Sequence, residues 1–163
     1  ELLGVGYLLF ERGLLILELG LFGVEVGEHT LVLGLDALRV FARGDVLVIA
    51  ALVGLHYYAY HVEIAQKLAE ALGAELGCTR PVVEAGWLEY RHQIGQTGVS
   101  VSPKLLVSIG VSGAIQHLAG IGGAECIIAI NEDPDASIFG AAQYKVVGDA
   151  VEVVEELLAQ LER

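Results

Sequence analysis

The sequence pattern from residue 46 onward predicts an α/β domain built on a parallel sheet. Short apolar runs recur there, as is typical of strands buried on both faces. Turn-forming residues follow these runs, and amphipathic helical stripes lie after two of them. A parallel sheet covered by helices requires this order of strand, turn, helix and strand.

The first strand is predicted at residues 46–50, which read Val-Leu-Val-Ile-Ala. A helix is predicted after it, because apolar residues recur at i, i+3, i+4 and i+7. The stripe consists of Ala65, Leu68, Ala69 and Leu72. Gly73 follows directly and predicts a left-handed cap that ends this helix.

The second strand is predicted at residues 105–109. It runs into the turn Gly110-Val111-Ser112-Gly113 and a short helix through Leu118. In an open parallel sheet, ligands bind beyond the carboxyl ends of the strands, where such turns lead into helices. The alternative is a plain strand-to-helix connection.

The third strand is predicted at residues 126–130 and is closed by the turn-forming residues 131–135. A fourth, short strand is predicted at residues 145–147. The chain finishes with a helix whose apolar stripe consists of Val154, Leu157, Leu158 and Leu161. The α/β domain is therefore expected to cover residues 46–163.

Residues 1–45 are rich in Leu and Gly and show no clean period, so we leave them unassigned. They are a possible remnant of an N-terminal domain. The chain begins at Glu1 and contains no Met, so we expect a fragment or a processed product.

Composition excludes several classes of protein. Of the 163 residues, 55% are hydrophobic and 18% charged, which excludes a disordered chain. The net charge of -12 makes nucleic acid an unfavourable partner. Cys78 and Cys126 lie far apart, which favours a reduced intracellular protein.

Mean hydropathy of +0.63 raises the alternative of an integral-membrane subunit. The uncharged windows at residues 46–62 and 105–124 are interrupted by His, Ser, Gln or Gly. A spanning helix needs about 20 predominantly apolar residues, so no membrane span is expected.

Three segments carry side chains suited to ligand binding. Gln116 and His117 follow the turn at residues 110–113, where His117 could instead bond a backbone carbonyl. The segment Gly95-Gln96-Thr97-Gly98 presents two polar side chains between glycines. Arg80 follows Thr79, and a surface ion pair is its alternative role. We expect no metal site and no catalytic nucleophile from the spacing of His, Cys and Ser.

Together these segments resemble the FAD-binding domain of the electron-transfer flavoprotein alpha subunit. The resemblance holds without a gap from Gly73 to Asp149 and extends more weakly over residues 46–161. The pieces that carry it are GCTRPVVEAGW at 77–87, QIGQTG at 93–98, VSPKL at 101–105, GVSGAIQHLAG at 110–120, AINEDP at 129–134 and VGD at 147–149. It implies a three-layer, Rossmann-like parallel sheet of the deoxyhypusine-synthase-like FAD/NAD-binding type.

The resemblance also implies how FAD would be held. Arg80 would lie against the isoalloxazine ring, Thr97 would offer its hydroxyl to N5, and His117 would approach the N1/C2-carbonyl edge. Backbone amides would hold the ribityl-pyrophosphate. These amides belong to Ile94, Gly95 and Gln96 and to Ser112, Gly113, Ala114, Ile115 and Gln116. The ribityl and adenosine parts would be met by Thr79, Asn131, Asp149 and Ala150.

The implied function is that of an electron carrier which transforms no substrate of its own. Its partners would be the beta subunit, an acyl-CoA dehydrogenase or similar flavin dehydrogenase, and a quinone reductase. The expected location is the prokaryotic cytoplasm, or the mitochondrial matrix in a eukaryote. The alternative is a nucleotide-binding structural module without a redox role.

One departure from the family concerns the segment after the first strand. The family has a Gly-Gly-Arg-Gly motif there, whereas Gly54 stands where its arginine is expected. His56 could replace part of the missing charge.

Overall fold

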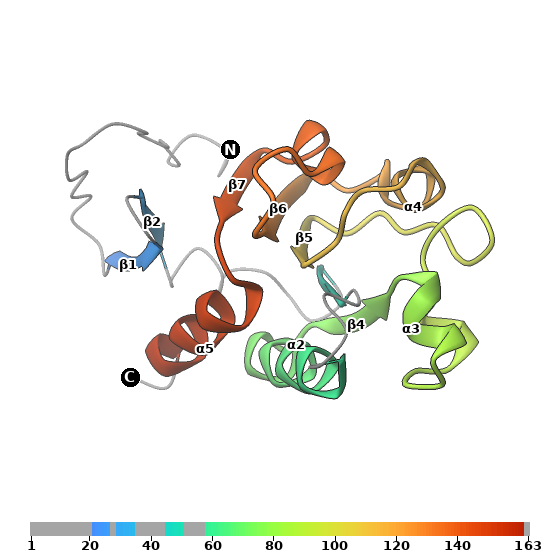
Figure 1. The fold of residues 1–163 in the computed structure, drawn as a ribbon, viewed down its shortest axis with the longest axis horizontal. Coiled ribbons are helices and arrows are strands. Elements are labelled where there is room, and N and C mark those ends of the chain that lie inside the picture. The colour runs from blue at the N-terminus through green and yellow to red at the C-terminus, as the bar shows by residue number, and fades with distance from the viewer. Residues whose placement is uncertain (1–20, 27–28, 35–44, 51–57, 162–163) are drawn as a thin grey trace.

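The computed structural model describes residues 21–26, 29–34, 45–50 and 58–161. A five-stranded parallel sheet with the order β4-β3-β5-β6-β7 lies at its centre (Figure 1). The strands are β3 (Val46–Ala50), β4 (Glu75–Cys78), β5 (Leu105–Ile109), β6 (Cys126–Asn131) and β7 (Tyr144–Val147). This sheet confirms the predicted α/β class.

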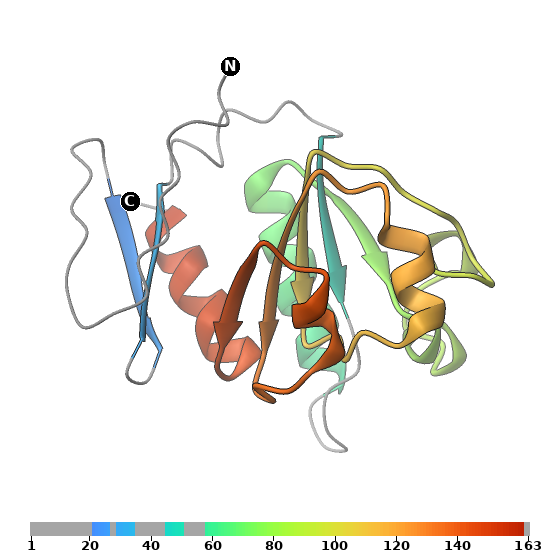
Figure 2. The same cartoon turned by 90° about the horizontal axis from the view of Figure 1, so that it is seen from above.

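Helices cover both faces of the sheet and give three layers, as Figure 2 shows. Helices α2 and α5 pack on one face, and α4 with the short 3-10 helix η2 packs on the other. The bounds are α2 (Tyr58–Leu72), α3 (Arg80–Glu84), η1 (Tyr90–His92), α4 (Ile115–Ile121), η2 (Ser137–Gly140) and α5 (Ala150–Leu161).

The central strands are buried on both faces, which explains their unbroken apolar sequences. In β3, Val46 and Val48 belong to the core beneath α2 and α5, whereas Leu47 and Ile49 belong to the core beneath α4. All five residues of β3 and all five of β5 are buried. Burial of each large aliphatic side chain contributes about 1.5–3 kcal/mol.

The connections of β3 determine where a ligand can bind. The chain passes from β3 through α2 to β4 on one side, and then crosses back to β5 on the other side of β3. Ala50, the last residue of β3, is paired with Ile109, the last residue of β5. In sheets of this kind, ligands generally bind at the carboxyl ends of the strands where the strand order reverses, here between β3 and β5.

Two predicted turns are confirmed in detail. Gly73 has a φ of 63°, and the amides of Gly73 and Ala74 bond the carbonyls of Glu70 and Ala69, which is the Schellman pattern. After β6, Asn131 Oδ1 accepts from the amide of Asp133, whose own carboxylate accepts from Asp135. These side-chain bonds close the turn at residues 131–135.

The structure also contains elements that the sequence did not predict. Strands β1 (Leu21–Val26) and β2 (His29–Gly34) form an antiparallel hairpin within the segment left unassigned, and β1 contacts α5. Strand β4 and helix α3 were likewise not predicted. No helix in the described ranges is long and apolar enough to cross a membrane. Gly54 and His56 lie outside the described residues.

Candidate functional site

The sheet brings the predicted site segments to one edge. Thr79 and Arg80 directly follow β4, and the turn that begins at Gly110 directly follows β5. Asn131 is the last residue of β6, and Asp149 lies between β7 and α5. Because the strands are parallel, all these positions lie beyond their carboxyl ends, at the predicted ligand edge.

The loop at residues 94–99 is fastened to both β4 and α4. The amide of Ile94 donates to the carbonyl of Cys78, at 2.9 Å, and the amide of Gln96 donates to the carbonyl of Gln116, at 2.7 Å. Within the loop, the amide of Gly95 donates to the carbonyl of Val99. The loop therefore forms one side of the candidate site and α4 forms the adjoining side.

Two glycines allow this close contact between loop and helix. Gly95 has a φ of 142°, and a Cβ there would lie 2.8 Å from the carbonyl oxygen of Gln116. A Cβ at Gly120 of α4 would lie 2.5 Å from the amide nitrogen of Gly95. Both distances are shorter than ordinary contacts, so only glycine lets the two backbones approach in this way.

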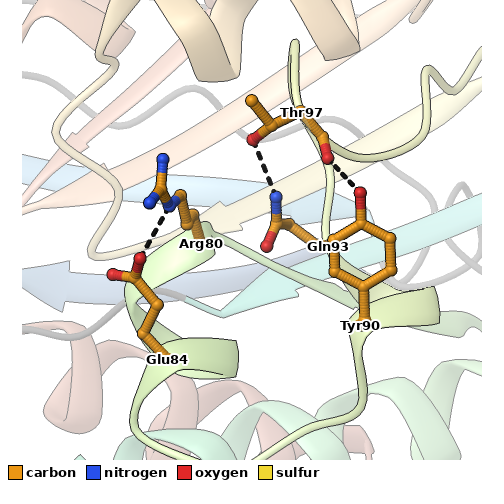
Figure 3. Close-up of polar contacts among 5 residues, drawn as sticks. All are labelled: Arg80, Glu84, Tyr90, Gln93 and Thr97. Atoms are coloured by element: carbon orange, nitrogen blue, oxygen red, sulfur yellow. Dashed lines mark hydrogen bonds and ion pairs between the residues drawn. The ribbon is translucent and has the colours of Figure 1, made fainter.

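Thr97 presents its hydroxyl on the exposed part of this loop (Figure 3). Its Oγ1 accepts a hydrogen bond of 2.9 Å from Nε2 of Gln93, and its backbone carbonyl accepts one from the phenol of Tyr90. A hydroxyl that accepts one bond still has a proton to donate. Gln93 and Tyr90 are functional candidates that the sequence prediction left out, although Gln93 begins the matching segment at residues 93–98.

His117 is buried in the first turn of α4, with one nitrogen paired and one unpaired. Its Nδ1 lies 3.0 Å from the carbonyl oxygen of Ile94, whereas no protein group bonds its buried Nε2. Burial lowers the pKa of His117, and the bond to Ile94 partly opposes this shift. A carbonyl only accepts, so Nδ1 donates and Nε2 of the neutral ring carries a lone pair.

The turn after β5 presents backbone amides without a backbone hydrogen-bond acceptor at the same edge, within the described residues. Gly110 and Gly113 have φ values of 66° and 87°, and a Cβ at Gly113 would lie 2.2 Å from the amide nitrogen of Ile138. In the described part of the chain, the amides of residues 112–115 donate to no backbone carbonyl. Amides arranged in this way at a helix start attract anionic oxygens.

Arg80 forms the surface ion pair that was its alternative role. Its Nε lies 2.7 Å from Oε1 of Glu84, and the two side chains are 62% and 57% exposed. The amide of neighbouring Thr79 donates to the carbonyl of Ala50 and so links the carboxyl ends of β4 and β3. The hydroxyl of Thr79 makes no capping bond to α3.

The side chains of Asn131 and Asp149 make hydrogen bonds within the protein itself, apart from any contact with a ligand. Asn131 Nδ2 donates to the carbonyl of Val111 at 2.8 Å and thereby links the ends of β6 and β5. Asp149 Oδ1 accepts from the amides of Val151 and Glu152 and caps α5. Ala150 is buried in the first turn of that helix.

The cysteines show no sign of reactivity in this structure. Cys78 and Cys126 are free, and burial raises the pKa of Cys78 to about 11 and also raises that of Cys126. Neither thiol is therefore a nucleophile near neutral pH. Among the described residues, no three His, Cys, Asp or Glu side chains gather as metal ligands would.

Comparisons with known proteins agree with this geometry. Residues 45–122 match the family described as the electron transfer flavoprotein FAD-binding domain. The chain is 52% identical over 95 residues to Protein FixB of Azotobacter vinelandii, covering 58% of this chain and 26% of that protein. It is 53% identical over 96 residues to the mitochondrial electron transfer flavoprotein subunit alpha of Arabidopsis thaliana, covering 59% and 26%.

A third relative is subunit LctC of the lactate dehydrogenase (NAD(+),ferredoxin) of Acetobacterium woodii, 48% identical over 101 residues, covering 62% of this chain and 24% of that subunit. The chain thus spans about a quarter of the length of these relatives. The matched residues include β3, β4, β5, α4 and the loop that carries Thr97. Over residues 45–122, the chain is similar to the electron transfer flavoprotein FAD-binding domain family.

Proposed function

We propose that this chain binds FAD and serves as the flavin-holding part of an electron-transfer flavoprotein alpha subunit. The observation that carries the proposal is the buried, unpaired Nε2 of His117 beside a loop that offers the Thr97 hydroxyl. An unpaired buried nitrogen is costly in the free protein, and a ligand with polar ring edges would satisfy it.

The polar groups at the sheet edge fit the parts of FAD in order. The amides of residues 112–115 suit the pyrophosphate, because they have no backbone acceptor within the described residues. Asp149 caps α5 through Oδ1, and its Oδ2 makes no bond within the described residues, so it suits a ribose hydroxyl. His117 and Thr97 suit the polar edges of the isoalloxazine ring.

When bound, the isoalloxazine ring would supply reversible electron transfer. The chain's own residues would then set the electrostatics around the ring. His117 gains a proton more readily when negative charge develops beside it, since that charge opposes the effect of burial on its pKa. The guanidinium of Arg80 is permanently charged, and it would reach the ring if its side chain left Glu84.

The rest of the proposed assembly is what the family resemblance implies. A beta subunit would complete the flavin site, while a flavin dehydrogenase and a quinone reductase would donate and accept electrons. We place the protein in the prokaryotic cytoplasm or in the mitochondrial matrix.

The test is to identify the ligand that copurifies with the 163-residue chain. We expect flavin absorbance, and FAD on chromatography after denaturing release. Recovery of FMN alone would contradict the assignment of FAD, and recovery of a colourless adenine nucleotide would contradict the redox role. Gly95→Ala should lose the flavin because its Cβ would meet the carbonyl of Gln116, whereas the control Gly140→Ala, with nothing within 4 Å of its Cβ, should retain it.

A further inference from the structure

We infer that Gln93 is a positioning residue, which fixes the Thr97 hydroxyl as a hydrogen-bond donor toward the ligand. The inference about the flavin rests on the proposed function, whereas the contact itself belongs to the chain alone. Gln93 would act through Thr97 without touching the ligand.

Gln93 is held rigidly by its own backbone. Its amide donates to the carbonyl of Tyr90, its carbonyl accepts from the amide of Val99, and it forms a bridge with Cys78 at the end of β4. The residue is only 4% exposed. Its side chain therefore starts from a fixed point below the loop and reaches Thr97 with little freedom to reorient.

The direction of the hydrogen bond determines what Thr97 can do. The Nε2 group of Gln93 donates to Thr97 Oγ1 at 2.9 Å and occupies an acceptor position on the hydroxyl. The hydroxyl proton must then point elsewhere, and Thr97 is exposed. A ligand atom with a lone pair, such as N5 of a flavin, is the partner that this arrangement favours.

Tyr90 holds the backbone of the same residue by a separate contact. Its phenol donates to the carbonyl of Thr97, as Figure 3 shows. The side chain of Thr97 is thus directed by Gln93 and its main chain by Tyr90. The two contacts can be removed independently, which separates orientation of the hydroxyl from placement of the loop.

Gln93→Glu provides the sharpest test because the new side chain has the same shape. Its carboxylate only accepts, so it would draw the Thr97 proton away from the ligand. The neutral acid, formed as pH falls, carries a proton and can donate to Oγ1 again. Burial at this position raises the pKa of a carboxyl group, so the change should occur in an accessible pH range.

For the FAD-loaded chain, we expect Gln93→Glu to lower the reduction potential of the flavin below that of wild type at high pH. As pH falls, the potential of the variant should approach the wild-type value. In a Thr97→Val background the same substitution should cause a smaller shift, because only the charge of the carboxylate then acts on the ring. Gln93→Met, which places no charge in the core, should give a smaller shift that does not depend on pH. Tyr90→Phe should weaken FAD binding without changing the potential.

A measurement without FAD keeps this inference separate from the proposed function. In the apo chain, NMR titration should give a lower pKa for the introduced carboxyl with Thr97 present than in the Thr97→Val background. Equal values would show that the two side chains do not meet, which overturns the inference. An unchanged potential in Gln93→Glu, or a shift of equal size with Thr97→Val, would also overturn it. A wild-type chain that binds no FAD would contradict only the proposed function. The titration of the apo chain would then decide whether the side chain at position 93 directs Thr97.

Discussion

At the residue scale, side chains at the sheet edge make structural contacts, and two of them, Asp149 and His117, also keep an unused polar atom. Asp149 caps α5 through Oδ1, and His117 holds the carbonyl of Ile94 through Nδ1. Asn131 bonds the carbonyl of Val111. Each contact fixes the orientation of a side chain before any ligand arrives, and such preorganisation reduces the entropic cost of binding.

The two roles of Asp149 can be separated by substitution. Asp149→Ala removes the cap and should lower the free energy of unfolding by about 1 kcal/mol. Asp149→Asn keeps a capping oxygen and should leave stability nearly unchanged, but it should weaken FAD binding because an amide group replaces the second carboxylate oxygen. Urea unfolding and flavin fluorescence titration would measure the two effects. Equal losses of stability in both variants would contradict the capping role.

The buried ring of His117 predicts a pH dependence of stability. Its pKa is lowered in the folded protein, so the unfolded state binds more protons as pH falls below about 6.5. Stability is therefore complete above that pH and falls on acidification toward the folded pKa. His117→Asn retains a donor near Ile94 and does not titrate.

The FAD-free wild type should lose stability relative to His117→Asn between pH 7.5 and pH 5.5. Urea unfolding at several pH values measures this difference. Parallel pH profiles for the two proteins would show that His117 is not held neutral by burial.

At the element scale, the sequence predicted the elements whose pattern is local. The strands β3, β5 and β6 are mostly apolar, β7 ends in Val146 and Val147, and α5 has a clear apolar stripe. Strand β4 was missed because its sequence Glu-Leu-Gly-Cys has one large apolar residue, and its pairing with β3 makes it a strand. Helix α3 has only five residues, although Pro81 in its first turn is a signal that could have revealed it.

The same limit applies to the candidate site. Glycine-rich segments and their order pointed to the loop at residues 94–98 and to the turn at 110–113. The pairing of Gln93 with Thr97, and that of Ile94 with His117, depends on chain segments that meet only in the fold. The hairpin of β1 and β2 has no alternating pattern in its sequence, and so it was not predicted.

The close contact between α4 and the loop at residues 94–99 can be tested by substituting two glycines near the C-terminal end of α4. Gly120→Ala places a Cβ 2.5 Å from the amide nitrogen of Gly95, so it should cost about 1–3 kcal/mol of stability and weaken FAD binding. Gly122→Ala is the matched control, since its Cβ meets only the carbonyl of Leu118, at 3.9 Å. Thermal unfolding measures the loss of stability in each of the two variants. Equal effects in the two variants would contradict a role of the close approach between Gly120 and Gly95, because the higher helix propensity of Ala cannot cause a loss.

At the scale of the whole molecule, the order of the strands places the site. Strand order is set by long-range pairing, and local patterns in one sequence do not specify it. The sheet edge beyond β3 and β5 also carries exposed apolar side chains on its loops. Ile115, at the start of α4, is 82% exposed, and Tyr90, in η1, is 63% exposed. Apolar side chains exposed around a ligand edge are typical of a surface that another protein covers.

This surface predicts that the chain associates at micromolar concentration, with itself or with a beta subunit. The chain carries a net charge of -12, so self-association is opposed by like charge, and added salt should strengthen it. Ile115→Ser should weaken association several-fold while changing stability by less than about 0.5 kcal/mol, because the side chain has few neighbours to lose. Sedimentation velocity over a range of protein and salt concentrations measures the association of the wild type and of Ile115→Ser. A wild-type chain that stays monomeric and fully loaded with FAD at every salt concentration would show that the flavin site is complete without a partner.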